Sequence, residues 1–175
     1  MSETLTEPLT EAKCEQPYLW PLCWEAWQAA RELREPPRDF SDYAPPPVSP
    51  EAELRWWHEQ VDSGQVLVTG LFSRRDDRLL GTLKAFDFTP DRSRCEVGIE
   101  ILNPDDYGQG IGRQALNLWL GFLKAQDVKE VYGLIHPENQ RSRRLFARLE
   151  FTETGLETDP LEAKMTFVRV EKKLT

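Results

Sequence analysis

Apolar residues recur along the chain at two spacings, and these predict a mixture of strands and helices. Short apolar runs bounded by glycine, proline or charged turns predict seven strands, at residues 18–22, 65–72, 79–88, 97–102, 129–135, 151–154 and 165–170. Longer stretches, in which apolar residues return every three or four positions, predict helices at residues 25–35, 50–63, 111–123 and 139–150.

The order of these elements predicts an α+β fold. Strands that follow one another directly suit antiparallel pairing, whereas strand, helix, strand, helix implies a parallel pair. We therefore expect a mostly antiparallel mixed sheet with a central parallel pair, flanked by about four helices. A right-handed crossover would place the ends of both parallel strands beside the turn that precedes the third helix. Gly81 is expected to mark a bulge.

The third helix begins at a glycine-rich turn and has a long apolar face. Its predicted face consists of Ile111, Ala115, Leu118, Trp119 and Phe122, which follow one another at helical spacing.

The turn itself carries Gly108, Gly110 and Gly112. A helix start has unpaired N–H groups and the positive end of the helix dipole, so a glycine turn there suits phosphate or pyrophosphate. A dinucleotide-binding fingerprint needs glycine where Arg113 stands, and a P-loop needs Lys-Ser/Thr where Arg113-Gln114 stand. The turn is therefore either a phosphate site of another kind or a plain helix start.

Length and charge narrow the class of protein. The 175 residues suit one domain, with residues 1–16 as a flexible acidic leader and residues 17–175 as the folded unit. A net charge of −8 argues against a nucleic-acid partner and favours a cationic substrate. Because no apolar run reaches membrane-spanning length and no secretory signal is evident, we expect a cytoplasmic protein without a membrane partner.

Cysteine and histidine do not suggest a metal site. Cys14, Cys23 and Cys95 form no Cys-x-x-Cys pair, and His58 and His136 have no partner at ligand spacing. We expect reduced thiols, no metal and no covalent cysteine intermediate. The proline-rich segment 36–50 is either a lid over a pocket or a plain connecting loop.

Two motifs resemble those of the GCN5-related N-acetyltransferases. The letters YGQGIG, residues 107–112, match the glycines of the family's Arg/Gln-x-x-Gly-x-Gly/Ala turn, with Tyr107 in place of Arg or Gln. The letters NQRSRRLFARLEF match the family's following helix, with Glu150 in place of glycine. The opening YLWPL, the helix SPEAELRWW and the strand CEVGIEI resemble the branch that contains the ribosomal-protein N-terminal acetyltransferases.

The resemblance implies a three-layer α/β/α fold whose parallel strands splay around acetyl-CoA. It implies direct acetyl transfer to a primary amine, on a small molecule or a protein N-terminus, by a monomer or homodimer. A non-catalytic CoA-binding or interaction module of the same fold is the alternative. A nicotinamide enzyme, which rests on the glycines alone, is a third reading.

The resemblance also implies which residues contact the coenzyme. The turn is expected to hold the pyrophosphate through backbone amides, and a strand N–H at Ile101 or Leu102 is expected to face the thioester carbonyl. Arg113, Arg141, Arg143 and Arg144 would add positive charge. The implied cofactor-binding residues are Ile101, Leu102, Tyr107, Gly108, Gln109, Gly110, Ile111, Gly112, Arg113, Asn139, Ser142 and Phe146.

The chemistry requires a proton acceptor, because an alkyl amine with a pKa of about 10.4 is protonated at neutral pH. Glu96 and Glu100 differ by four positions and so share one face of the strand, where either could act as the base. Phe146 stands where many relatives have a tyrosine acid. The acid role therefore falls to Ser142, to water or to no group, and Ser142 could equally serve only as a cofactor contact.

Overall fold

The computed structural model describes residues 17–33, 49–158 and 165–175. The expected leader, most of the proline-rich segment and residues 159–164 lie outside this part of the chain, so the predictions for them stay untested. The described strands form one mixed sheet in the order β1-β2-β3-β4-β5-β7-β6. They are β1 (Tyr18–Pro21), β2 (Leu67–Phe72), β3 (Leu79–Phe86), β4 (Arg94–Ile101), β5 (Glu130–Ile135), β6 (Thr152–Thr158) and β7 (Thr166–Lys173).

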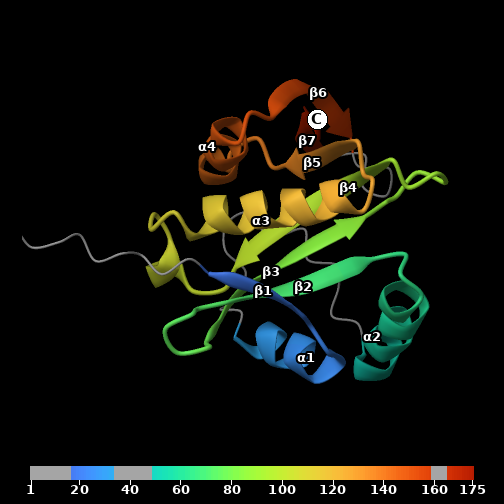
Figure 1. Ribbon diagram of the computed structural model, residues 1–175, viewed down its shortest axis with the longest axis vertical. Helices are drawn as coiled ribbons and strands as arrows, with labels where there is room; N and C mark the ends of the chain where they lie inside the picture. The colour runs from blue at the N-terminus through green and yellow to red at the C-terminus, as the bar shows by residue number, and fades with distance from the viewer. Residues whose placement is uncertain (1–16, 34–48, 159–164) are drawn as a thin grey trace, which may run out of the picture.

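Helices cover both faces of this sheet (Figure 1). The described helices are α1 (Trp24–Glu32), α2 (Pro50–Trp56) with its π-helical continuation η1 (Trp57–Asp62), the 3-10 turn η2 (Pro104–Asp106), α3 (Ile111–Ala125) and α4 (Gln140–Arg148). Trp27 of α1 and Trp57 of η1 pack with Val68 and Phe72 on one face of β2. Helix α3 lies in the larger core on the opposite face. The three-layer α+β prediction is confirmed.

The central parallel pair is short. Strands β4 and β5 pair only at Arg94↔Glu130, Cys95↔Val131 and Glu96↔Tyr132, although β4 continues to Ile101 and β5 to Ile135. Every other neighbouring pair in the described sheet is antiparallel. We call the last paired position, Glu96 and Tyr132, the parting point of the two strands.

The buried face of α3 differs from the predicted one. Leu118 and Phe122 are 42% and 43% exposed, so their assignment to the apolar face was wrong. The side chains that face the sheet form a broader stripe, because a helix that crosses several strands buries residues on both sides of its contact line. This stripe consists of Ile111, Ala115, Leu116, Trp119, Leu120 and Leu123.

The predicted irregularity at Gly81 is confirmed. The β2–β3 register shifts between Leu71 and Phe72, which pair with Gly81 and Leu79. A Cβ at Gly81 would lie 2.1 Å from the carbonyl oxygen of Glu100, so only glycine permits β3 to approach β4 this closely. The bulge therefore fixes β3 against the strand that carries the candidate site.

Candidate functional site

The glycine turn is built from backbone conformations that favour glycine. Gly108 and Gly110 have φ angles of 76° and 80°, in the left-handed region, and Gly110 caps α3. The first intrahelical bond runs from Gln114 N–H to the Gly110 carbonyl, at 3.1 Å. The N–H groups of Ile111, Gly112 and Arg113 precede it and so have no partner within α3. The turn can therefore present backbone amides to an anion.

The loop that leads into this turn is anchored from two sides. Asp106 is buried and accepts two hydrogen bonds from the Arg78 guanidinium, at 2.8 and 3.0 Å. Gln109 Nε2 donates to the Asp105 carbonyl at 2.7 Å. The ion pair joins the β2–β3 turn to the loop after β4, so the position of the turn does not depend on local sequence alone.

Tyr107 links three parts of the site. Its hydroxyl donates to the Ile101 carbonyl at 3.3 Å, at the end of β4. The guanidinium carbon of Arg141, on α4, lies 3.7 Å from the centre of its ring. No ion pair of Arg141 with a carboxylate is found among the described residues, and partial burial lowers the pKa of this guanidinium. A cation without a carboxylate partner thus lies beside the glycine turn.

The other candidate arginines have different surroundings. Arg143 binds both carboxylate oxygens of Glu153, at 2.8 and 2.9 Å. Arg144 is exposed, and Arg113 is exposed on the first turn of α3. Arg141 is exposed as well, but it differs from the other three because its guanidinium stacks on the ring of Tyr107 at the turn.

The start of α4 is held by contacts within the protein. Asn139 Oδ1 accepts a hydrogen bond from the Ser142 N–H at 3.0 Å and so caps the helix. Phe146 is 4% exposed and packs edge-to-face on Phe151 and close to Gly133. Phe146 therefore belongs to the core, and cofactor contacts at Asn139, Ser142 and Phe146 stay predictions.

The two candidate oxyanion donors differ in their bonding. Leu102 N–H donates to the Leu80 carbonyl at 2.9 Å, so it is already used in the β3–β4 ladder. Because hydrogen bonding alternates along an antiparallel pair, the N–H of Ile101, opposite Gly81, points away from β3 and toward β5. Of the two, only the Ile101 amide is directed toward the space between the parting strands.

Glu96 lies at the parting point, on the face opposite α3. Burial, together with the nearby carboxylates of Asp87 and Glu157, raises the pKa of Glu96 to about 7. The Arg169 guanidinium and the Tyr132 hydroxyl act in the opposite direction. A carboxyl group that titrates near neutral pH can accept a proton from an ammonium group and release it again.

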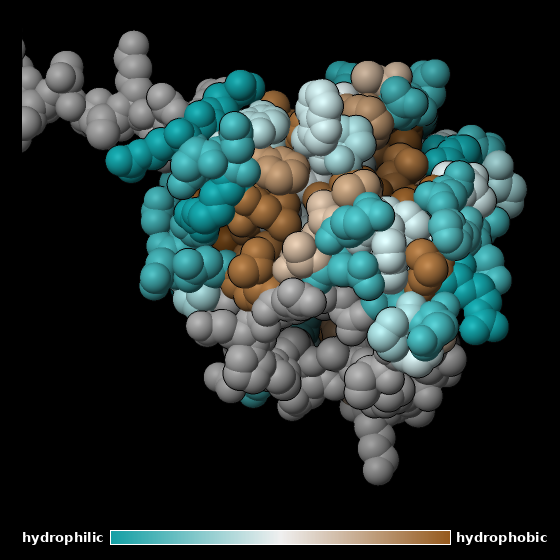
Figure 2. All heavy atoms as spheres, turned by 90° about the horizontal axis from the view of Figure 1, so that it is seen from below, coloured by the Kyte–Doolittle hydropathy of each residue, from teal (hydrophilic) through white to brown (hydrophobic). Residues whose placement is uncertain are grey.

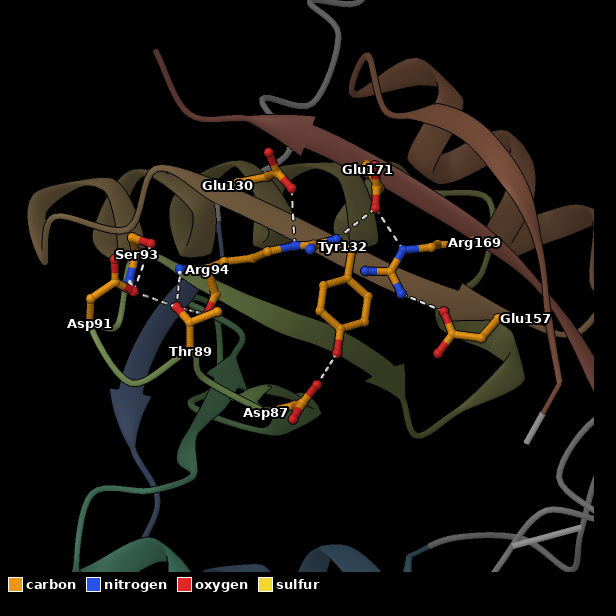
Figure 3. Close-up of polar contacts among 10 residues, drawn as sticks. All are labelled: Asp87, Thr89, Asp91, Ser93, Arg94, Glu130, Tyr132, Glu157, Arg169 and Glu171. Carbon is orange, nitrogen blue, oxygen red and sulfur yellow. Dashed lines mark hydrogen bonds and ion pairs between the residues drawn. The ribbon is translucent and has the colours of Figure 1, made fainter. Parts of the chain in front are cut away.

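Tyr132, the partner of Glu96 in the parallel pair, contacts side chains of β4, β7 and the loop after β3; Figure 3 shows these contacts. The guanidinium carbons of Arg169 and Arg94 lie 3.9 and 5.1 Å from the centre of the Tyr132 ring. Both guanidinium groups bind Glu171, at 2.6 and 2.7 Å. The Tyr132 hydroxyl donates to Asp87. Burial and this bond raise the pKa of the hydroxyl, so it stays protonated.

Glu100 shares the face of Glu96, as predicted. Glu96 pairs with Phe86 and Glu100 with Thr82 in the same antiparallel register, and Gly98 lies between the two glutamates. A Cβ at Gly98 would lie 3.9 Å from the Phe86 ring. Because Gly98 has no side chain, no β4 side chain separates the two carboxylates on this face of the strand.

Sequence reasoning missed Tyr132, Asp87 and Arg169 as parts of the site. They come from β5, the loop after β3 and β7, and no local motif connects them. Only the pairing of β5 with β4 and β7 brings them together. A tyrosine in an otherwise aliphatic strand was the one available signal.

Cys95 and the residue types that bind metals were the other candidates for chemistry in the part of the chain that the structure describes. Burial raises the pKa of the Cys95 thiol to about 12, so it is not an activated nucleophile. In residues 17–33, 49–158 and 165–175, the structure shows no group of three or more His, Cys, Asp or Glu that could hold a metal ion. Within the same residues no helix has the length and apolar character needed to span a bilayer.

Comparisons with known proteins show the fold and the family. A search of curated protein sequences finds no significant match. The structure resembles a spermidine N-acetyltransferase from Vibrio cholerae solved with CoA and spermine, with a TM-score of 0.76, 15% identity, and coverage of 91% of this chain and 96% of that chain. It also resembles a domain from Methanocaldococcus jannaschii, with a TM-score of 0.72, 21% identity, and coverage of 90% and 98%.

A third similar structure is the Vibrio cholerae spermidine/spermine N-acetyltransferase with manganese ions, with a TM-score of 0.71, 16% identity, and coverage of 91% and 93%. At these identities the likeness shows the fold. These similar structures do not show the expected ribosomal-protein branch. The family model described as "Acetyltransferase (GNAT) domain" matches residues 18–152. On this match, which spans more than half of the sequence, the chain belongs to the GNAT acetyltransferase family.

Proposed function

We propose that this protein transfers an acetyl group from acetyl-CoA directly to a primary amine, with Glu96 as the general base. The observation that carries the proposal is the position of Glu96 and Tyr132 at the parting point of β4 and β5. The glycine turn lies beyond the far end of β4, after Ile101. A coenzyme whose pyrophosphate binds the turn can extend between the strands with its acyl end toward Glu96.

Each chemical role has a group in the right state. The Ile101 N–H points toward the space between the strands and would bind the thioester oxygen as it becomes negative. Glu96, five residues before Ile101 on β4, would take the ammonium proton through water before the amine attacks. A thiolate with a conjugate pKa of about 8.5 leaves readily, so no acid at Phe146 is required.

Direct transfer is favoured over a covalent acyl-enzyme. Cys95 is buried on the α3 face of β4, away from Glu96, and its pKa is raised to about 12. If acid-quenched protein retained label from acetyl-CoA, the direct mechanism would be wrong.

Two measurements test the proposal. Acetyl-CoA should raise the melting temperature, whereas NAD should not, and free thiol should appear when a primary amine is added. Stabilisation by acetyl-CoA without thiol release with any amine would favour a non-catalytic coenzyme-binding module. Stabilisation by NAD alone would support the nicotinamide reading.

A further inference from the structure

A pocket with a polar lining, the α3–α4 pocket, lies between α3 and the end of α4, on the opposite face of the sheet from Glu96. Its volume is about 310 Å³, at the lower end of the range for small-molecule sites. Helix α4 lies beside the start of α3 (Figure 1), where Gly112 of α3 approaches Leu145 of α4. The polar residues that line the pocket are Arg113, Gln114, Asn117, Arg148, Glu150 and Lys172.

This lining differs from the surface at the α1–α2 end of the molecule. There, hydrophobic groups reach the surface among hydrophilic ones (Figure 2). Among the described residues, the lining of the α3–α4 pocket has one apolar member, Leu149. Polar groups from two helices and a strand therefore converge on the pocket, which suits a charged ligand better than an apolar one.

Two guanidinium groups line the pocket from different helices. Arg113 lies on the first turn of α3, and Arg148 is the last residue of α4. A guanidinium group binds phosphate oxygens through paired N–H donors in a fixed geometry. Because the two groups come from separate helices, a phosphate in the pocket can accept hydrogen bonds from two sides.

A third cation borders the pocket from β7. The side chain of Lys172 is 22% exposed and donates to the Leu149 carbonyl at 2.8 Å and to Glu150 at 3.1 Å. The Glu150 carboxylate thus offsets the charge of Lys172, and the two guanidinium groups add positive charge beyond this pair. These contacts also tie the end of α4, which carries Arg148, to the sheet.

The backbone at Glu150 has a conformation that favours glycine. Its φ is 64°, in the left-handed region, and it follows the C-cap of α4, Leu149. Helices often end in glycine at this position, because a side chain there is strained. This chain has a glutamate there, and the glutamate binds Lys172 at the pocket. Strain of this kind is a mark of positions where a site needs the side chain.

The amide of Gln114 adds a polar group with unused hydrogen-bonding capacity. Its Oε1 atom is buried and lacks a hydrogen-bond partner in the part of the chain that the structure describes. Burial of such an atom is unfavourable unless a partner is supplied. A phosphorylated molecule that has a hydroxyl or N–H group near its phosphate can supply that partner from the pocket.

From this geometry we infer that the α3–α4 pocket is a second anion site, which binds the phosphate group of a small molecule between Arg113 and Arg148. It is separate from the glycine turn, because Arg141, which stacks on Tyr107 at the turn, lies about 10 Å along α4 from Arg148. Two sources share this chemistry: the 3′-phosphate of a coenzyme A bound at the turn, and a separate phosphorylated molecule. The inference does not depend on acetyl transfer.

Nuclear magnetic resonance tests the site, with inorganic phosphate as the probe. The backbone amide signals of Asn117 and Glu150 should shift as phosphate is added and should saturate with a Kd of about 1 mM or lower. The signals of Ile111 and Gly112 report phosphate at the glycine turn separately. Arg148→Gln should weaken the response at the pocket by about tenfold, through loss of one charge-assisted contact, and should leave the response at the turn unchanged.

Arg144→Gln, at an exposed arginine elsewhere on α4, is the matched control and should leave both responses unchanged. Absence of a phosphate response at Asn117 and Glu150 would overturn the inference. A response there that Arg148→Gln does not weaken would overturn it as well. Loss of coenzyme binding at the turn, or of thiol release with every amine, would overturn the proposed function alone.

A comparison of CoA with dephospho-CoA, which lacks the 3′-phosphate, distinguishes the two sources. If the pocket holds the 3′-phosphate of the coenzyme, Arg148→Gln should weaken CoA binding by about tenfold and leave dephospho-CoA binding unchanged. Bound CoA should then also block the phosphate response at the pocket. If the pocket holds a separate molecule, phosphate should still bind to the CoA complex. Either result supports the site and names its ligand class.

Discussion

The two ends of the β4–β5 pair hold two different kinds of site. At the far end, the glycine turn presents backbone amides and depends on two left-handed glycines. At the parting point, Glu96 depends on side chains from β5, β7, β6 and the loop after β3. The first site is built mainly from backbone groups of one stretch of sequence, which the Arg78–Asp106 ion pair anchors to the β2–β3 turn. The second is non-local, and its chemistry depends on how each neighbour sets the pKa of one carboxyl group.

The largest effect is expected from a substitution that removes the proposed base at the parting point. Glu96→Gln should lower kcat/KM by about 100-fold or more at pH 8, the range for loss of a general base, while the affinity for CoA stays within about twofold. The rate is measured by thiol release and the affinity by calorimetry. Glu100→Gln, on the same face, is the control; a larger loss there than at Glu96 would move the base to Glu100.

The same variant should change stability in the opposite sense. In the folded protein the pKa of Glu96 is raised to about 7, so its charged form is destabilising above that pH. Glu96→Gln should therefore raise the free energy of unfolding at pH 8 by about 3–4 kcal/mol. The gain should shrink as pH falls and vanish below the pKa of an unfolded glutamate, about 4.3. Chemical denaturation at several pH values checks this. A constant gain would contradict a buried, titrating Glu96.

A smaller effect is expected from a substitution that disturbs only the glycine turn. Gly110 has a φ of 80°, so Gly110→Ala should lower the free energy of unfolding by about 1 kcal/mol and weaken CoA binding by about tenfold. Gly121→Ala, on the exposed side of α3, is the control, because a Cβ there meets nothing within 4 Å. It should stabilise the protein by about 0.5 kcal/mol and leave CoA binding unchanged. Equal CoA affinities in the two variants would remove the turn from the coenzyme site.

The smallest effect is expected from Arg141, which tests whether the coenzyme site extends from the glycine turn to α4. Arg141→Ala should weaken CoA binding by about fivefold through loss of one cation near the pyrophosphate, and should affect pantetheine, which lacks phosphate, much less. Arg144→Ala, an exposed arginine on the same helix, should change neither affinity. If Arg141→Ala weakened both ligands equally, the stacking of Arg141 on Tyr107 would be purely structural.

The same contrast explains what the sequence could predict. All seven strands and the glycine turn were predicted, because their signals are local. Strand β6 extends to Thr158, beyond the predicted end, because an edge strand with exposed, charged residues lacks an apolar signal. Helix α3 buries Leu116, Leu120 and Leu123 instead of Leu118 and Phe122, since the stripe depends on which strands the helix crosses.

The parting-point site could be predicted only in part. Glu96 was a candidate from its strand position, but the order of preference between Glu96 and Glu100 was not available. It comes from the position of Tyr132 beside Glu96 and from the bond between Tyr132 and Asp87, residues 45 positions apart in sequence. Contacts over such distances have no sequence motif, so burial and the raised pKa of Glu96 became visible only in the fold.

The most direct test of the central claim is the pH dependence of kcat/KM for a primary amine, measured by thiol release from acetyl-CoA. In the natural protein, kcat/KM should rise with pH through an apparent pKa near 7, separate from the titration of the amine at about 10.4. In Glu96→Gln the rise near pH 7 should be absent. The same rise at full amplitude in Glu96→Gln would contradict Glu96 as the base.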